Sequence, residues 1–269
     1  MQLERISFMR PNRVKRALKN GEVQIGTWVN VLRTPQIAQM LATSGFDFMY
    51  IDMEHSCLSI ETVGDLCLAA LGAGLVPIVR PSAKEPHLLT RPLDNGAMGL
   101  LIPHVDTREE AEAVARAVRF PPLGERGMNL QGVHTGYGRA NGEEYIKSTH
   151  EETLLLVQIE SDQGIRNLDS ILSVDGVDGA VIGRGDMSTD LGLPGQTNHP
   201  EVAKRVEMMI ASCQRHGKVP GLLVQDVASA KEWIAKGIRL VPYSNEVSML
   251  VNAGSKAVGE IRGFAKESL

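Results

Sequence analysis

The chain has 269 residues, of which 43% are hydrophobic and 22% are charged, so it can bury the core of one large domain or of two small ones. A net charge of −4 and only five Phe, four Tyr and two Trp provide neither a basic surface nor a base-stacking platform. We therefore expect no nucleic-acid partner.

In the first 120 residues, apolar periodicity and turn residues alternate between helical and strand patterns. Ser59 and Thr107 stand where helix N-caps are expected. The spacing predicts helices over 12–20, 35–45, 60–72, 86–94 and 107–118, and strands over 23–29, 48–51, 76–79 and 99–102.

The segment 120–150 gives no clear period, and a loop of that length is usually functional or contains short helices. Beyond it the pattern resumes. It predicts strands over 154–159, 179–182, 219–223 and 238–241, and helices over 163–173, 200–216 and 226–236. The final segment, 246–266, carries one apolar stripe at helical spacing, which predicts a long amphipathic helix.

The strand pattern identifies the fold class. Eight short, apolar, mostly non-alternating strands with helices between them are typical of parallel strands buried on both faces. We predict one (β/α)8 TIM barrel over residues 1–269, with an additional N-terminal helix and a long C-terminal helix. A doubly wound open sheet is the alternative, but no Gly-x-Gly-x-x-Gly motif follows the first strand.

Three cysteines and the start of the chain bear on location. Cys57, Cys67 and Cys213 have no metal-binding spacing and are typical of reduced thiols in a cytoplasmic protein. The first residues lack the apolar segment of a secretion signal, and no apolar run reaches about 18 residues. We expect a cytoplasmic protein that does not span a membrane.

Polar residues stand at the ends of five consecutive predicted strands. In chain order they are Asp52, Glu54 and His55, then Arg80, His104, Glu160 and Asp186. In a barrel the carboxyl ends of the strands meet on one face, where such enzymes carry their active sites. Each residue taken singly could be a loop charge or a helix cap, so the prediction depends on the whole set.

Two of these residues suggest a metal site. Glu160 and Asp186 follow neighbouring strands, which lie about 4.8 Å apart. Two carboxylates that leave other positions to water and substrate suit Mg²⁺ or Mn²⁺. The alternative is that both acids only cap the helices that follow them.

Two arginines suggest anion binding. Residues 183–186 can expose backbone N–H groups at a helix start, and Arg184 lies within that segment. Arg80 could clamp an anion or stabilise a developing enolate, or it could form a salt bridge across the barrel mouth.

With these residues the chain resembles the HpcH/HpaI family of metal-dependent (class II) hydroxy-oxo-acid aldolases. The resemblance covers most of the chain and depends on several short motifs in order. They are residues 46–47, 51–52, 54–55, 79–81, 120–122, 124, 126–127, 158–160, 182–183, 186–188, 191–192 and 199–202.

The resemblance implies a reversible cleavage of a sugar-acid type 4-hydroxy-2-oxo acid to pyruvate and an aldehyde, through a metal-bound pyruvate enolate. It implies Mg²⁺, Mn²⁺ or Co²⁺ on Glu160 and Asp186. His55, paired with Asp52, is the implied acid/base, and Arg80 is implied to stabilise the enolate.

Substrate contacts and assembly are implied in the same way. Gln158 is the implied neighbour of the substrate, and the backbone at Gly185 and Asp186 is implied to hold its carboxylate. The family also forms homo-oligomers, dimers that assemble into hexamers, in which the last helix packs on a neighbouring subunit.

The sequence departs from the family pattern in three places. Arg184 replaces a proline, where it could seat an extra carboxylate or phosphate or close a subunit contact. Residues 128–134 and 243–246 also differ. Two alternatives therefore stay open: a non-catalytic metabolite-binding paralogue, and a citrate-lyase-like enzyme acting on another substrate such as a CoA thioester. No basic cluster for the CoA phosphates is evident, which counts against the second.

Overall fold

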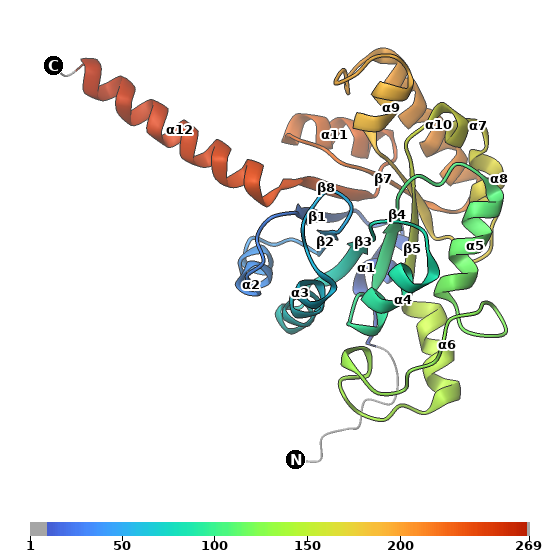
Figure 1. Ribbon diagram of the computed structural model, residues 1–269. Coiled ribbons are helices and arrows are strands. Elements are labelled where there is room, and N and C mark those ends of the chain that lie inside the picture. Colours follow the sequence, from blue (N-terminus) through green and yellow to red (C-terminus); the bar gives the residue numbers. More distant parts are fainter. Residues whose placement is uncertain (1–9, 268–269) are drawn as a thin grey trace.

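The computed structural model describes residues 10–267 and contains a closed barrel of eight parallel strands, each hydrogen-bonded to the next and the eighth to the first (Figure 1). This confirms the predicted (β/α)8 fold. The strands are β1 Gln24–Val29, β2 Phe48–Asp52, β3 Val76–Arg80, β4 Gly99–Ile102, β5 Leu154–Ile159, β6 Gly179–Ile182, β7 Val219–Leu222 and β8 Leu240–Asn245.

Helices follow the strands and form the outer layer. They are α1 Arg13–Lys19, α2 Gln36–Thr43, α3 Ile60–Ala73, α4 Pro86–Asp94, α5 Arg108–Val118, α6 Gly142–Glu152, α7 Asp162–Arg166, α8 Leu168–Leu172, α9 Arg184–Asp190, α10 Pro200–His216, α11 Val227–Lys236 and α12 Glu246–Glu267. None of the helices in the described part of the chain is long and apolar enough to cross a membrane.

The predicted caps account for where two helices begin and end. The Ser59 side chain accepts a hydrogen bond from the backbone of Thr62, and α3 ends at Gly74 in the left-handed conformation. Thr107 and Glu110 form a reciprocal capping box at the start of α5. Each cap forms between residues close together in the sequence, so it can be predicted without knowledge of the barrel.

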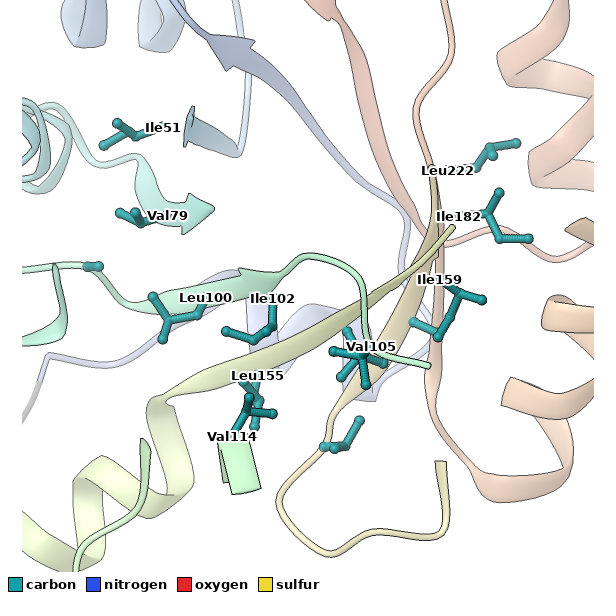
Figure 2. Close-up of a cluster of buried hydrophobic side chains, with 14 of the residues drawn as sticks. Ile51, Val79, Leu100, Ile102, Val105, Val114, Leu155, Ile159, Ile182 and Leu222 are labelled. Atoms are coloured by element: carbon teal, nitrogen blue, oxygen red, sulfur yellow. The ribbon is translucent and has the colours of Figure 1, made fainter. Parts of the chain in front are cut away.

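The strands are buried on both faces because they separate two hydrophobic clusters. Alternate residues of β2 show the division: Phe48 and Tyr50 belong to a cluster inside the barrel, whereas Met49 and Ile51 belong to a larger one beneath the helices. Figure 2 shows part of that outer cluster, in which strand residues such as Leu155 meet Val114 of α5. This explains the continuous apolar runs of the sequence.

Helix α1 covers the amino-terminal end of the barrel. The side chain of Asn12 donates to the backbone oxygens of Met98 and Glu152 at 3.0 Å. The Lys15 ammonium is buried and donates to the Thr153 carbonyl at 2.7 Å and to Asp178 Oδ2 at 2.8 Å. Burial lowers the pKa of Lys15 to about 8.

Three segments differ from the sequence-based expectation. The unassigned segment 120–150 contains a 3-10 turn, Val133–Thr135, and the regular helix α6, whose N-cap is Asn141. The single helix expected over 163–173 is two short helices that meet at Asn167. A further short helix, α9, follows β6. The strong polar content of these segments hides their helical period.

Helix α12 extends away from the barrel (Figure 1). It meets β8 and β1 only at its start. Its predicted apolar stripe is exposed over its length, with Leu250 at 70%, Ile261 at 68% and Phe264 at 72%. Ile25, on the outward side of β1, is also 42% exposed.

Candidate active site

The strand-end residues gather at the carboxyl-terminal mouth of the barrel, as expected. Asp52 ends β2, Arg80 ends β3, Glu160 follows β5, and Asp186 lies in the first turn of α9 after β6. A cavity of about 330 Å³ opens there. Its lining includes Trp28, Asn30, His55, Arg80, Gln158, Glu160, Gly183, Arg184, Gly185, Asp186, Thr197, Leu223, Gln225, Ser244 and Asn245.

A buried ion pair fixes Arg80. Its Nε and Nη2 donate to the two carboxylate oxygens of Asp52, each at 2.8 Å, because β2 and β3 pair with these two residues side by side. Nη1 lies 3.0 Å from Glu54 Oε2, and the guanidinium stacks on the Trp28 ring at 4.4 Å. Arg80 therefore faces the cavity from a rigid, fully supported position.

The expected pairing of the His55 imidazole with Asp52 takes a different form. The Asp52 carboxylate is already occupied by Arg80 and by Asn30 Nδ2, and His55 reaches it only through its backbone N–H, at 3.5 Å. The imidazole instead lies 3.7 Å from Glu54, and its side chain is 58% exposed at the mouth. Glu54, rather than Asp52, is the carboxylate beside the histidine ring.

His104 links the acids of β2 and β5. Its Nε2 lies 3.0 Å from Glu54 Oε1 and its Nδ1 lies 3.3 Å from Glu160 Oε2. The backbone of His104 has φ = 53°, a left-handed conformation that residues other than glycine seldom adopt. Backbone strain held against two carboxylates is typical of functional sites.

Glu160 is the most perturbed acid of the site. Its side chain is buried, and its Oε1 accepts a hydrogen bond of 2.7 Å from Gln158 Nε2. Burial raises the pKa of Glu160 to about 7, with further upward contributions from the negative charges of Glu54 and Asp186, while His104 acts in the opposite direction. A buried carboxylate whose charge is disfavoured in this way is stabilised by a cation.

Gly183 provides the space that Glu160 occupies. A Cβ atom on residue 183 would overlap Glu160 Oε1 and come within 2.8 Å of its Cγ and 2.9 Å of Gln158 Nε2. The φ of Gly183 is −87°, so its backbone would suit any residue. Space, rather than backbone freedom, therefore accounts for the glycine at this position.

The residues present fit the divalent metal ion that the sequence implies. Among residues 10–267 no group of three or more His, Cys, Asp or Glu side chains is arranged to hold a metal, so Glu160 and Asp186 would have to act with water or substrate oxygens. Hard oxygen ligands with open positions suit Mg²⁺ and Mn²⁺. Glu160 and Asp186 line the same cavity, and the negative charge of Asp186 adds to the effect of burial in raising the pKa of Glu160.

Several lining residues were not assigned a role from the sequence. Trp28 and Asn30 come from the end of β1, which carries no charged group that would have marked it. Trp28 Nε1, Asn30 Oδ1 and Gln158 Oε1 are buried and make no protein hydrogen bond in the described structure. Buried polar atoms of this kind at a cavity wall are suited to water or a ligand.

The three segments that depart from the family pattern differ in whether they line the cavity. Arg184 and residues 244–245 line the cavity, whereas residues 128–134 do not. Glu246 has a structural role, because its Oε1 accepts backbone hydrogen bonds from Asn30, Val31 and Leu32. Residues 243–245, expected in a loop, form the end of β8, and Glu246 at the start of α12 holds the loop after β1.

Comparison with known proteins identifies the family. The family model described as HpcH/HpaI aldolase/citrate lyase matches residues 24–253, nearly the whole barrel and the start of α12. The chain belongs to the HpcH/HpaI family. It is accordingly a carbon–carbon lyase of the aldolase type, in a family whose members generally depend on a divalent metal ion.

Individual relatives agree with this assignment. This aldolase is 36% identical to hydroxypyruvate/pyruvate aldolase of Roseobacter denitrificans, over 90% of this chain and 94% of the relative. It is 37% identical to 2-keto-3-deoxy-L-rhamnonate aldolase of Klebsiella pneumoniae, over 90% of each. The HpcH/HpaI aldolase structure from Desulfitobacterium hafniense matches with a TM-score of 0.88 and 32% identity, over 92% of this chain and 96% of that one.

Proposed function

We propose that this aldolase reversibly cleaves a sugar-acid type 4-hydroxy-2-oxo acid into pyruvate and an aldehyde, with a divalent metal ion held by Glu160 and Asp186. The observation that carries the proposal is the buried Glu160 carboxylate, which sits in space left by Gly183 and shares one cavity with Asp186 and Arg80. The names of the relatives support the choice of pyruvate and a deoxy sugar acid as the substrate class.

The metal ion would supply Lewis acidity, which stabilises the negative charge of the pyruvate enolate by several kcal/mol. Arg80 adds a fixed positive charge. Two of its five N–H groups donate to Asp52, Nη1 lies 3.0 Å from Glu54 Oε2, and the residue lines the cavity. Asp52 is fully buried, so we assign it to positioning Arg80 rather than to contact with the substrate.

His55 is the proposed acid/base. Imidazole exchanges protons near neutral pH, and the ring lies at the cavity with Glu54 beside it. In cleavage it would take the proton of the 4-hydroxyl. The C3–C4 bond then breaks, its electron pair passes into the enolate, the aldehyde leaves, and a proton added to C3 of the enolate gives pyruvate. In the synthetic direction the same proton returns to the new hydroxyl.

Substrate contacts complete the site. The Gln158 Oε1 atom has no protein partner and lines the cavity, so it can accept a hydrogen bond from the substrate or its water. The backbone at Gly185 and Asp186 is exposed at the mouth, where it would hold the carboxylate of the oxo acid. Arg184 lies beside them.

We also propose that the protein is a homo-oligomer built from dimers, as in the hexamers of the family. In an isolated subunit, the apolar stripe of this helix would remain in contact with water, which is unfavourable. Helix α12 has the length, about 33 Å, to lie along a second subunit. The exposed Ile25 marks a strand face that the protein's own last helix leaves open.

Metal-dependent enolate formation is the direct test. Oxaloacetate loses carbon dioxide through the same pyruvate enolate, so we expect purified protein to decarboxylate it. EDTA should abolish the activity, and Mg²⁺, Mn²⁺ or Co²⁺ should restore it. Glu160→Gln should lower the restored rate by at least about a hundredfold.

The control variant is Glu144→Gln, which removes an exposed carboxylate on α6. It should behave as the parent protein. No activity with any of the three metals, in protein shown to be folded by circular dichroism, would contradict the proposal and favour a metabolite-binding paralogue.

A further inference from the structure

Arg184 differs from the other arginine of the cavity in having no acidic partner. Its Nη1 donates to Asn198 Oδ1 and its Nη2 donates to the Leu223 carbonyl, both at 2.9 Å. No carboxylate of the described residues lies within ion-pair distance of it. Arg80, by contrast, is paired with two acids.

The surroundings of Arg184 make an unpaired charge costly. The residue is half-buried in the cavity wall, and Asp226, which lines the adjoining cavity, forms no ion pair with it. The Asp226 carboxylate is engaged elsewhere, because its Oδ1 caps α11 by accepting the backbone N–H of Ser229 at 2.8 Å. A partly desolvated cation without an ion pair is stabilised when an anion binds it.

The guanidinium has donors to spare. It carries five N–H groups in a planar fork, and its two recorded hydrogen bonds both go to neutral oxygens. Those two bonds hold it between the loops that follow β7 and precede α10. The remaining donors suit a carboxylate or phosphate, which arginine binds in a two-pronged geometry.

The position of Arg184 indicates which part of a substrate it would meet. A second cavity, of about 370 Å³, lies between α10 and α11 next to the one that contains Glu160. The two cavities share Arg184, Thr197 and Gln225 in their walls. A substrate whose oxo-acid end lies at Glu160 and Asp186 can therefore extend past Arg184 into the outer cavity.

We propose that Arg184 selects aldehydes that carry an anionic group, a carboxylate or a phosphate, at the end remote from the aldehyde carbon. This inference rests on the proposed aldolase function and specifies its substrate class. The shared cavity wall forms the aldehyde subsite, and the charge of Arg184 sets its preference.

The test compares matched aldehydes in the addition of pyruvate. The carboxylate probe is 4-oxobutanoate and its neutral counterpart is 4-methylpentanal, which has the same shape. Glycolaldehyde phosphate and glycolaldehyde form the phosphate arm. For each enzyme the measured quantity is the ratio of kcat/KM for the anionic aldehyde to that for the neutral one, which does not depend on the fraction of folded protein.

We expect the parent protein to prefer at least one anionic aldehyde. Arg184→Met should lower that ratio roughly 10- to 100-fold, the range for a hydrogen bond to a charged group. Arg184→Lys should keep part of the preference, because the charge remains while the planar fork is lost. Lys231→Met, which removes an exposed charge on α11 near the outer cavity, should leave the ratio unchanged.

A parent ratio near one in both arms, or a preference that survives in Arg184→Met, would overturn the inference. The exchange of pyruvate methyl protons with deuterated solvent distinguishes a failure of the role of Arg184 from a failure of the proposed aldolase function. Normal exchange without a preference would contradict the role of Arg184 alone. Absence of exchange in the parent protein would contradict the proposed function, and this inference with it.

Discussion

At the scale of single residues, the site combines two arginines in opposite states. Arg80 is fixed by Asp52 at the end of β2 and by Glu54 just beyond it, so it contributes a charge whose position does not depend on a ligand. Arg184 has no such pair, so its charge is available to whatever enters the cavity. Among the acids, burial raises the pKa of Glu160 to about 7.

The pKa of Glu160 predicts how metal binding depends on pH. A metal ion binds the carboxylate and not the acid, so protons compete with it below pH 7. We expect the dissociation constant for Mn²⁺ to rise about tenfold for each pH unit between 7 and 5, and to level off above pH 7. Isothermal titration at several pH values measures this.

The metal-free protein should show the opposite trend in stability. Because the folded pKa of Glu160 is raised from 4.5, its proton stabilises the fold fully below pH 4.5, and this contribution is lost as the pH rises through about 7. Glu160→Gln should remove this dependence of the thermal unfolding temperature on pH.

The metal-binding prediction has its own contrary outcome. A dissociation constant for Mn²⁺ that does not change between pH 5 and 7 would show that Glu160 is not a ligand.

At the scale of elements, the junction of β6 with α9 shapes the proposed metal site. Gly183 is the residue between them, and the Glu160 carboxylate fills the space that a side chain on residue 183 would take. Gln158 lies in the neighbouring strand β5, and its partner Glu160 directly follows that strand. The close approach of these two strand ends, rather than any one residue, therefore creates the cradle.

Gly183→Ala should displace Glu160 and weaken Mn²⁺ binding by about tenfold or more, within the range for residues that orient a metal ligand. Equilibrium titration with Mn²⁺ measures the effect. Gly72→Ala is the matched control, since a Cβ atom there would meet no atom within 4 Å. Equal Mn²⁺ affinity in Gly183→Ala and the parent protein would argue against this cradle.

The elements also show what the sequence could and could not predict. The eight strands were legible because each is buried on both faces and so forms a continuous apolar run. Helix α6 was not, because only its Tyr145, Thr149 and Glu152 are buried, two of them polar. Its apolar period is therefore too weak to detect.

The same division applies to the candidate site. That Asp52, Arg80, Glu160 and Asp186 meet at one mouth followed from their places at strand ends. Their partners did not follow, because contacts such as those of His104 depend on which side chains of adjacent strands are long enough to reach each other. Periodicity and spacing contain no information about that reach.

At the scale of the whole molecule, α12 is the feature that a single subunit does not explain. Its stripe consists of apolar residues that remain 39–72% exposed: Val247, Leu250, Val251, Val258, Ile261 and Phe264. The first strand leaves Ile25 uncovered as well. Both observations concern apolar surface that a second copy of the chain would bury.

Introducing charge on this stripe should break the assembly. We expect Leu250→Glu combined with Ile261→Glu to lower the mass measured by sedimentation equilibrium from an oligomer to a monomer, because two charges would be buried in the interface. Asn252→Glu combined with Lys256→Gln makes the same change in net charge at exposed polar positions and should leave the mass unchanged. A parent protein that is already monomeric would contradict the proposed assembly.

The closure of the barrel by α1 also has a consequence for the order in which the molecule forms. Lys15 and Asn12 are synthesised early, yet three of their partners, Glu152, Thr153 and Asp178, lie 138–163 residues further along the chain. Although Arg13 of α1 also bonds to Asp47 and Gly74, and Asn12 to Met98, the helix cannot complete its docking on a nascent chain until about two-thirds of the protein has been synthesised. Contacts of such high sequence separation are intrinsically slow to form. The contacts of Lys15 with Thr153 and Asp178 therefore form only after β5 and β6 have been made, and their formation reports that these strands have joined the barrel.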